Sequence, residues 1–235
     1  MAREIISEIR QSVFAVIIER VNPQQGEQRA QVAGTGFFVS NDGYFVTADH
    51  VINLDHGRPA GRLREIKDKI MIAQIQPDGR SVSVVGPMQV VVENRTKDYA
   101  ILKAPDTLPK VQKYLDIDLT ARFEGEEVSI CGYPLASSNQ DPQSGQILLD
   151  IYIRVSAGIL MCQRLDNLTQ ILEVDFPILP GNSGGPLIAT TSRRVLGLAT
   201  ATNTVPGPNG TPMGMFGICT DIRELQEDLR NKGII

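Results

Sequence analysis

The 235-residue sequence contains few of the side chains that bind metals or form disulfides. Its two histidines, His50 and His56, are not spaced as zinc ligands, and its three cysteines form no Cys-x-x-Cys pair, so we expect no metal site. Cys131, Cys162 and Cys219 cannot all pair with one another, and each lies among apolar or small residues. We therefore expect buried, reduced thiols, which argue against a disulfide-rich secreted protein and favour a reducing compartment.

Excess positive charge and long apolar runs are also missing, and we expect no signal peptide. The net charge is −4 and the sequence pI is about 5.3, which argues against a protein that binds nucleic acid through a basic surface. The apolar run at residues 13–18 is short and suits a strand, so we expect no contact with a membrane. The N-terminal sequence MAREIISE lacks the charged and apolar regions of a signal peptide. Together with the unpaired cysteines, this predicts a cytoplasmic protein.

One stretch is rich in glycine, the octapeptide PGNSGGPL at residues 180–187. A nucleophilic serine needs an exposed hydroxyl and backbone N–H groups that converge beside it to stabilise an oxyanion. Glycine lets the backbone adopt that shape because it tolerates positive φ, and the N–H groups of Gly181 and Ser183 would be the donors. A bare GNSG is more simply interpreted as a turn before a strand. The full octapeptide is more specific, and it requires a histidine and a carboxylate elsewhere in the chain.

Both partners have candidates. His50 follows a segment in which two apolar runs flank the turn signal NDG, a pattern that predicts a hairpin and places His50 just past a buried strand. His56 lies in the polar sequence DHGRP, and we assign it to the surface without a role. Asp98 directly precedes the apolar run at residues 99–102, so the adjoining strand can bury it, although taken alone it could be an ordinary loop residue. A buried carboxylate that accepts the imidazole N–H fixes the tautomer of the ring.

The chain order His50, Asp98, Ser183 is that of the chymotrypsin-like proteases. The blocks TADHVI, DYAIL and GNSGGPL around these residues resemble the three motif blocks of trypsin-like peptidases, and most of all those of the HtrA-type branch. The blocks GEEVSICGYP, VSAGI, VLGL and MFGI also resemble that branch. The resemblance extends over residues 34–222.

The resemblance implies an all-β fold of two antiparallel six-stranded β-barrels of the chymotrypsin type. Length and an apolar content of 42% allow the required core. Apolar residues spaced three and four apart at residues 221–231 predict an amphipathic C-terminal helix, capped by Thr220 or Asp221. We place the N-terminal barrel at residues 1–108 and the C-terminal barrel with its helix at residues 109–235. HtrA-type proteases usually carry a C-terminal PDZ domain, and too few residues follow the second barrel for us to expect one here.

The resemblance also implies a reaction. In a serine endopeptidase, Ser183 would attack a peptide carbonyl while His50 accepts its proton, and Asp98 would orient His50. The N–H groups of Gly181 and Ser183 would form the oxyanion hole, and the reaction would pass through an acyl-enzyme. The substrate would be a protein or peptide, and no cofactor is implied.

Two alternatives stay open. A catalytically silent or partner-activated chymotrypsin-fold binding module would share the fold, but silent members usually lose a triad residue and this chain retains all three. Asp49 stands where the family usually has a small residue. Because neighbouring side chains at a strand end point apart, we expect Asp98 and not Asp49 to orient His50. The sequence identifies no regulatory partner and no oligomer.

The primary specificity pocket of the family lies between the segment before the nucleophile and the following strand. The family position at its base is Pro177, and the backbone of Thr200, Ala201 and Thr202 should pair with the substrate as an added strand. These walls contain no charged side chain, so we expect cleavage after small or medium aliphatic residues. If the loop is shifted so that Asp175 reaches the base, the preference would instead be arginine or lysine.

Overall fold

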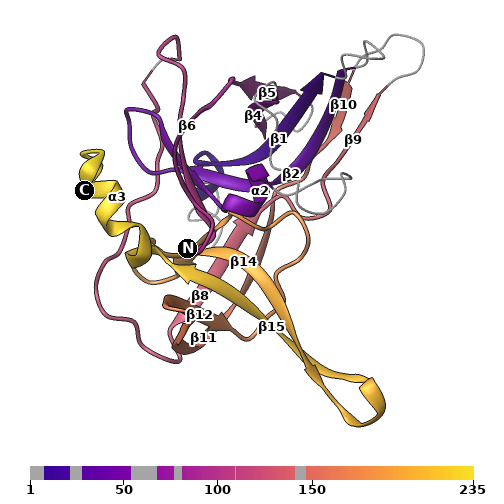
Figure 1. The fold of residues 1–235 in the computed structure, drawn as a ribbon, viewed down its shortest axis with the longest axis vertical. Helices are drawn as coiled ribbons and strands as arrows, with labels where there is room; N and C mark the ends of the chain where they lie inside the picture. The colour runs from indigo at the N-terminus through magenta and orange to yellow at the C-terminus, as the bar shows by residue number, and fades with distance from the viewer. Residues whose placement is uncertain (1–7, 22–27, 54–67, 77–80, 109, 141–146) are drawn as a thin grey trace.

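The chain folds into two bodies of antiparallel β-structure, which lie one above the other in Figure 1. The computed structural model describes residues 8–21, 28–53, 68–76, 81–108, 110–140 and 147–235. His56, which the sequence assigns to the surface, lies outside the described residues. Within these ranges, no helix combines the length and the apolar content needed to cross a membrane. The prediction of an all-β fold is confirmed.

The N-terminal body is a seven-stranded antiparallel sheet in the order β5-β4-β1-β2-β3-β7-β6. Its strands are β1 (Val13–Val21), β2 (Gln28–Phe38), β3 (Tyr44–Thr47), β4 (Lys69–Ile75), β5 (Val82–Val85), β6 (Gln89–Asn94) and β7 (Tyr99–Lys103). The resemblance predicts a six-stranded barrel here, whereas the described residues form a sheet of seven strands. The additional strand arises because Gly86 and Pro87 separate β5, which pairs with β4, from β6, which pairs with β7. A proline has no N–H to donate to a sheet, so it commonly ends a strand.

The C-terminal body is a closed six-stranded barrel in the order β11-β12-β15-β14-β13-β8, as predicted. Its strands are β8 (Glu127–Gly132), β11 (Arg154–Asp166), β12 (Thr169–Val174), β13 (Pro186–Ala189), β14 (Val195–Pro206) and β15 (Pro212–Asp221). Between β8 and β11, β9 (Ser137–Gln140) and β10 (Ile147–Asp150) form a separate hairpin beside β2. The ends of β14 and β15 extend beyond the barrel as a long two-stranded arm (Figure 1).

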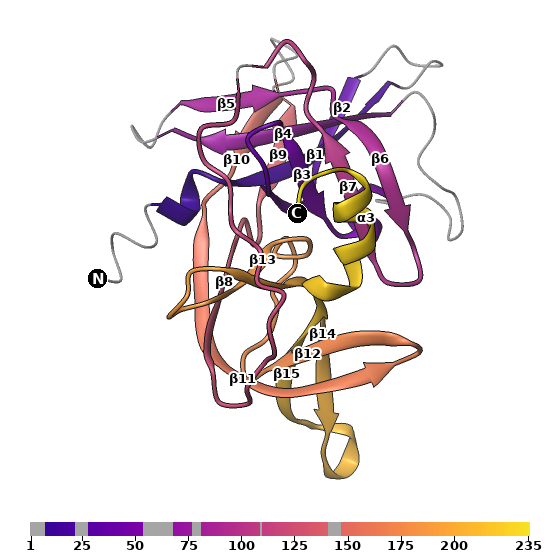
Figure 2. The same ribbon diagram turned by 90° about the vertical axis from the view of Figure 1, so that its left-hand side faces the viewer.

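The chain ends in a short helical segment, which returns to the N-terminal body. It consists of the 3-10 turn η2 (Ile222–Leu225) and the helix α3 (Gln226–Asn231). The Asp221 carboxylate accepts a hydrogen bond from the N–H of Arg223, so Asp221 is the residue that caps this segment. Figures 1 and 2 both place α3 beside β6, and its apolar residues belong to the same buried cluster as those of the N-terminal sheet. The predicted helix is confirmed, whereas the domain boundary at residue 108 stays a prediction.

Candidate active site

The structure brings His50 and Asp98 together. His50 lies in the short helix α2 (Asp49–Asn53), which follows β3, so the chain turns into a helix where the sequence suggests only a strand end. The ring atom Nδ1 of His50 lies 2.7 Å from Oδ2 of Asp98, and the backbone N–H of His50 donates to Oδ1 of Asp98 at 3.0 Å. The first N–H groups of a helix lack partners within the helix, so Asp98 satisfies one of them. One carboxylate thus fixes both the ring and the backbone of His50.

Asp49 points away from this pair, as expected. Its side chain accepts a hydrogen bond from Nδ2 of Asn53 at 2.8 Å, and its carboxylate lies 4.0 Å from Nε of Arg95. Burial raises the pKa of the Asp49 carboxyl, and the negative charges of Asp98 and Glu93 raise it further. The structure therefore gives Asp49 its own partners, and the His50 ring is not one of them.

Ser183 lies in a loop that only glycine can close. Gly184 has a φ of +82°, and a Cβ atom there would lie 2.2 Å from the carbonyl oxygen of Thr35 and 2.3 Å from Oγ1 of Thr47. The Ser183 hydroxyl donates to the carbonyl oxygen of Thr200 at 3.3 Å, and among the described residues it makes no hydrogen bond to the His50 ring. The same loop packs against Ala48, two residues before His50. Nucleophile-to-base hydrogen bonds are often long or absent in ligand-free structures.

The backbone before Ser183 is arranged to leave two donors open. The N–H of Leu135 donates to the carbonyl oxygen of Pro180 at 2.9 Å. Because C=O and N–H point in opposite directions across a trans peptide, the N–H of Gly181 is directed away from Leu135. Within the described chain, the N–H groups of Gly181 and Ser183 have no hydrogen-bond acceptor. Two neighbouring free N–H groups are suited to binding an oxygen that carries negative charge.

Thr35 joins this loop to the N-terminal body, although no motif in the sequence assigns it a role. Its buried hydroxyl donates to the carbonyl oxygen of Gly181 at 2.6 Å and accepts from the N–H of Tyr133 at 3.0 Å. Its own N–H donates to the carbonyl oxygen of Ser183 at 2.8 Å, and its carbonyl oxygen accepts from Oγ1 of Thr47 at 2.7 Å. The only local signal in the sequence is a threonine between two glycines.

A cavity of about 390 Å³ opens beside Ser183. Its lining includes all four residues that the sequence assigns to substrate binding, namely Pro177, Thr200, Ala201 and Thr202. Met215 of the arm also lines it, and no charged side chain contributes to the lining. Asp175 lies outside the cavity, where Oδ1 accepts a hydrogen bond from the N–H of Ile159 at 2.8 Å. The geometry therefore favours an uncharged pocket over one with Asp175 at its base.

The hydroxyl of Thr202 bridges two walls of this cavity. It accepts from the N–H of Ile178 at 2.7 Å and donates to the carbonyl oxygen of Ile178 at 2.7 Å. The sequence predicts a role for Thr202 only through its backbone. The bridge connects β14 to the segment before Ser183, so it fixes the separation of the two walls.

Two solved structures have the same fold as this chain. The HtrA-type protease AlgW with tripeptide superposes with a TM-score of 0.62 at 18% identity, over 100% of this chain and 64% of that chain. The active form of the Rv3671c protease from M. tuberculosis superposes with a TM-score of 0.59 at 18% identity, over 96% of this chain and 82% of that chain. At such identities the likeness establishes the fold alone.

Curated relatives correct the predicted location. DegP-like serine endoproteases of Hahella chejuensis and Rhizobium meliloti, named as probable periplasmic proteins, are 28% and 26% identical to this chain over 70% and 81% of its length. The expectation of a cytoplasmic location is contradicted by these relatives. It rested on the N-terminal sequence and on the unpaired cysteines. Burial raises the pKa of Cys131 to about 12 and also raises that of Cys219. Such thiols are unreactive, so they do not indicate the redox state of the compartment.

A broader comparison identifies the family. The magnetosome formation protease MamE of Magnetospirillum gryphiswaldense is 31% identical over 77% of this chain and 20% of its own length. The uncharacterized protein y4bJ of Sinorhizobium fredii is 30% identical over 76% of this chain and 23% of its own length. This chain thus spans less than a third of these relatives. The family model of the trypsin-like peptidase domain matches residues 34–198. With the HtrA-like relatives and the two-body β fold, this match shows that the chain belongs to the trypsin-like peptidase family.

Proposed function

We propose that this chain is a serine endopeptidase that cleaves peptide bonds through an acyl-enzyme. The observation that carries the proposal is the His50–Asp98 pair, in which Asp98 accepts from the backbone of His50 at 3.0 Å and lies 2.7 Å from its ring. With Nδ1–H donated to Asp98, the other ring nitrogen is an acceptor, as a general base requires. Membership of a peptidase family supports a protein or peptide as the substrate.

The chemistry assigns one role to each group. Ser183 transfers its proton to Nε2 of His50 as its oxygen attacks the peptide carbonyl, and the charge of Asp98 stabilises the imidazolium that forms. The N–H groups of Gly181 and Ser183 stabilise the oxyanion of the tetrahedral intermediate. Protonated His50 then returns the proton to the leaving amine, and water hydrolyses the acyl-enzyme by the same steps in reverse.

A second candidate function has one observation in its favour. The Ser183 hydroxyl donates to Thr200 and not to His50, which is also the geometry expected of a module that a partner must activate. The donation is weak at 3.3 Å, and rotation about one side-chain bond can redirect it. We therefore keep the partner-activated module as the alternative that experiment must exclude.

Labelling with a fluorophosphonate probe distinguishes the two. We expect the native protein alone to form one covalent adduct, on Ser183, because only an activated serine attacks the phosphorus, whereas heat-unfolded protein should form none. Mass spectrometry of the digested adduct would locate it. An adduct that forms only after a peptide ligand is added would favour the partner-activated module, and an adduct on another residue would contradict Ser183 as the nucleophile.

The cavity beside Ser183 supports a preference for aliphatic residues before the cleaved bond. Its lining offers no carboxylate, so a lysine or arginine side chain would lose water without gaining a charged partner. Pro177, Ile178 and Met215 offer apolar surface instead. We propose that alanine, valine or leucine occupies this pocket, and that the backbone of Thr200 and Thr202 pairs with the substrate as an added strand.

The Thr202 bridge provides a test of this pocket. Thr202→Val keeps the shape but leaves the N–H and carbonyl oxygen of Ile178 without their partner, at a cost of about 1–3 kcal/mol for each buried group. We expect kcat/KM for an aliphatic peptide to fall about 10-fold in Thr202→Val and to change little in Thr202→Ser, which keeps the hydroxyl. Sequencing the cut sites in a peptide library checks the preference itself. Dominant cleavage after arginine or lysine would show that the pocket is wrongly assigned.

The names of the DegP-like relatives favour a site of action outside the cytoplasm. Several are described as probable periplasmic endoproteases. We propose a periplasmic or secreted location for this chain, where fractionation of the producing cell would find it.

A further inference from the structure

The turn that carries Asp98 holds this residue in a conformation that aspartate adopts more readily than most residues with a side chain. Asp98 has a φ of +53°, in the left-handed region, which is uncommon for a residue with a side chain. This conformation directs both carboxylate oxygens to His50. Within the turn, Asn94 provides support, since its Oδ1 accepts from the N–H of Lys97 at 3.1 Å. Residues in such strained regions persist when their surroundings hold them in place.

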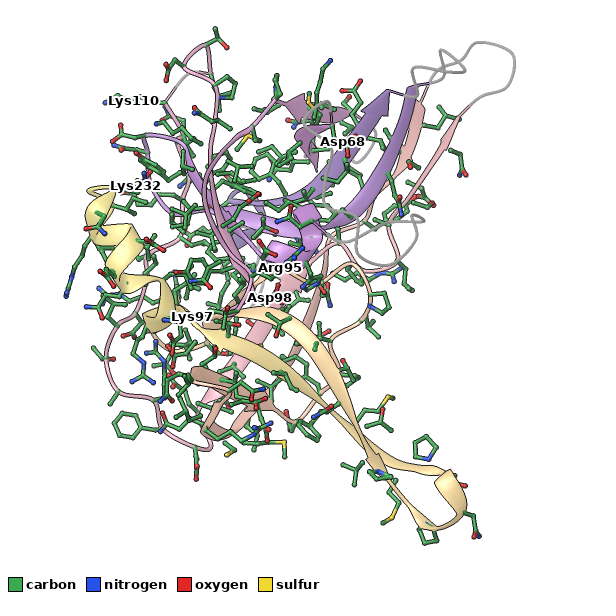
Figure 3. The ribbon with its side chains drawn as sticks, viewed as in Figure 1. Asp68, Arg95, Lys97, Asp98, Lys110 and Lys232 are labelled. Atoms are coloured by element: carbon green, nitrogen blue, oxygen red, sulfur yellow. The ribbon has the colours of Figure 1, made fainter. Side chains whose placement is uncertain are left out.

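The turn that carries Asp98 is held by residues near the C-terminus of the chain. Figure 3 shows Lys97 and Asp98 where the turn between β6 and β7 meets the C-terminal segment. Oγ1 of Thr220 donates to the carbonyl oxygen of Lys97 at 3.0 Å, and Nζ of Lys97 lies 2.6 Å from Oε2 of Glu224. The residue before Asp98 is therefore held through both its backbone and its side chain.

The residue after Asp98 is held as well. Tyr99 is 2% exposed, and its hydroxyl donates to Oδ2 of Asp228 in α3 at 2.7 Å while accepting from Nδ2 of Asn94 at 3.2 Å. Burial, and next the hydrogen bond to Asp228, raise the pKa of Tyr99, so its phenol stays protonated and has one proton to donate. A hydrogen bond to an ionised carboxylate is shorter and stronger than one between neutral groups.

From these contacts we infer that Asp228 and Glu224 are positioning residues for the proposed reaction. They hold Tyr99 and Lys97, and so keep Asp98 between them in the conformation that accepts from His50. The inference rests on the proposed function, in which Asp98 orients the base. It gives the C-terminal segment a role beyond burying apolar surface, which Ile222, Leu225 and Leu229 already provide.

A set of variants in α3 tests this role. Asp228→Ala removes the acceptor of Tyr99, whereas Asp228→Asn keeps an oxygen that can accept from the phenol. Because small misplacements of catalytic groups are costly, we expect kcat for a peptide substrate to fall about 10-fold in Asp228→Ala, with KM changed less than about 2-fold and with most of kcat restored in Asp228→Asn. Glu227→Ala is the matched control, since Glu227 lies exposed on the same helix. If Glu227→Ala lost as much kcat as Asp228→Ala, the effect would be general loosening of the helix and the inference would fail.

A spectroscopic measurement separates this inference from the proposed function. The Nδ1 proton that His50 shares with Asp98 should give a low-field proton resonance in wild type and in Asp228→Asn, and a weakened one in Asp228→Ala. This readout does not require hydrolysis, so it tests the positioning role even if the wild type cleaves no peptide, a result that would count against the proposed function alone. If Asp228→Ala does not fold, Tyr99→Phe removes the same hydrogen bond by deleting one hydroxyl. An unchanged resonance and an unchanged kcat in the folded variant would overturn the inference.

Discussion

Replacing Ser183 by alanine is expected to lower kcat/KM for a peptide substrate by about 10³-fold to 10⁶-fold. In the proposed mechanism this hydroxyl is the attacking group, and what remains without it is the binding of substrate and the stabilisation of the oxyanion. The fold should not change, because the Ser183 hydroxyl makes one hydrogen bond, at 3.3 Å, in a loop. We expect the free energy of unfolding to stay within about 1 kcal/mol of wild type.

The experiment compares wild type, Ser183→Ala and Ser156→Ala in casein hydrolysis and in thermal unfolding. Ser156 is a partly buried serine on β11 and controls for the loss of a hydroxyl elsewhere in the same barrel. Because a far larger fall in kcat/KM is expected, turnover by Ser183→Ala above about a tenth of wild type would contradict the proposed mechanism. Loss of activity together with loss of the cooperative unfolding transition would mean that Ser183 acts on the fold, and this too would count against its role as nucleophile.

The sequence predicts the parts of the site that depend on neighbours in the chain. The glycines around Ser183 can be interpreted locally, because glycine adopts a positive φ, as at Gly184, more readily than residues with a side chain. Asp98 before a buried strand is also a local pattern. Chain order then links these residues to His50, and this order is what makes the resemblance to peptidases specific.

The supports of the site depend on distant residues, and no local pattern predicts them. Thr35 bonds to Gly181 across 146 positions of sequence, and Tyr99 bonds to Asp228 across 129. The sequence predicts that Asp228 is on a helix, but it does not indicate which residues Asp228 or Thr35 meets. Pairing between distant elements is set by the packing of the whole chain. The cytoplasmic location was wrongly predicted for a related reason. Burial makes the thiols of Cys131 and Cys219 unreactive, so their unpaired state does not indicate a reducing compartment.

The second large effect is expected at Thr35, where one buried hydroxyl supports the backbone at Gly181, a proposed oxyanion donor. In Thr35→Val the shape is kept, but the carbonyl oxygen of Gly181 and the N–H of Tyr133 lose the group that bonds them at 2.6 and 3.0 Å. Each buried unpaired group costs about 1–3 kcal/mol, so the free energy of unfolding should fall by a few kcal/mol. The loop can recover these bonds only by moving Gly181, whose N–H is one of the two proposed oxyanion donors.

Thr35→Val should therefore change kcat more than it changes KM. Loss of one oxyanion donor typically lowers kcat by about 10²-fold to 10³-fold, and we expect Thr35→Val to approach this range with little change in KM. Thr35→Ser, which keeps the hydroxyl and removes the methyl group, should retain most of kcat. Steady-state kinetics on wild type, Thr35→Val and Thr35→Ser show whether the hydroxyl or the methyl group of Thr35 is responsible. Equal losses in the valine and serine variants would mean that Thr35 acts through the packing of its methyl group. A selective loss in the valine variant would show that a hydroxyl from the N-terminal body sets the geometry of a site whose proposed nucleophile belongs to the C-terminal barrel.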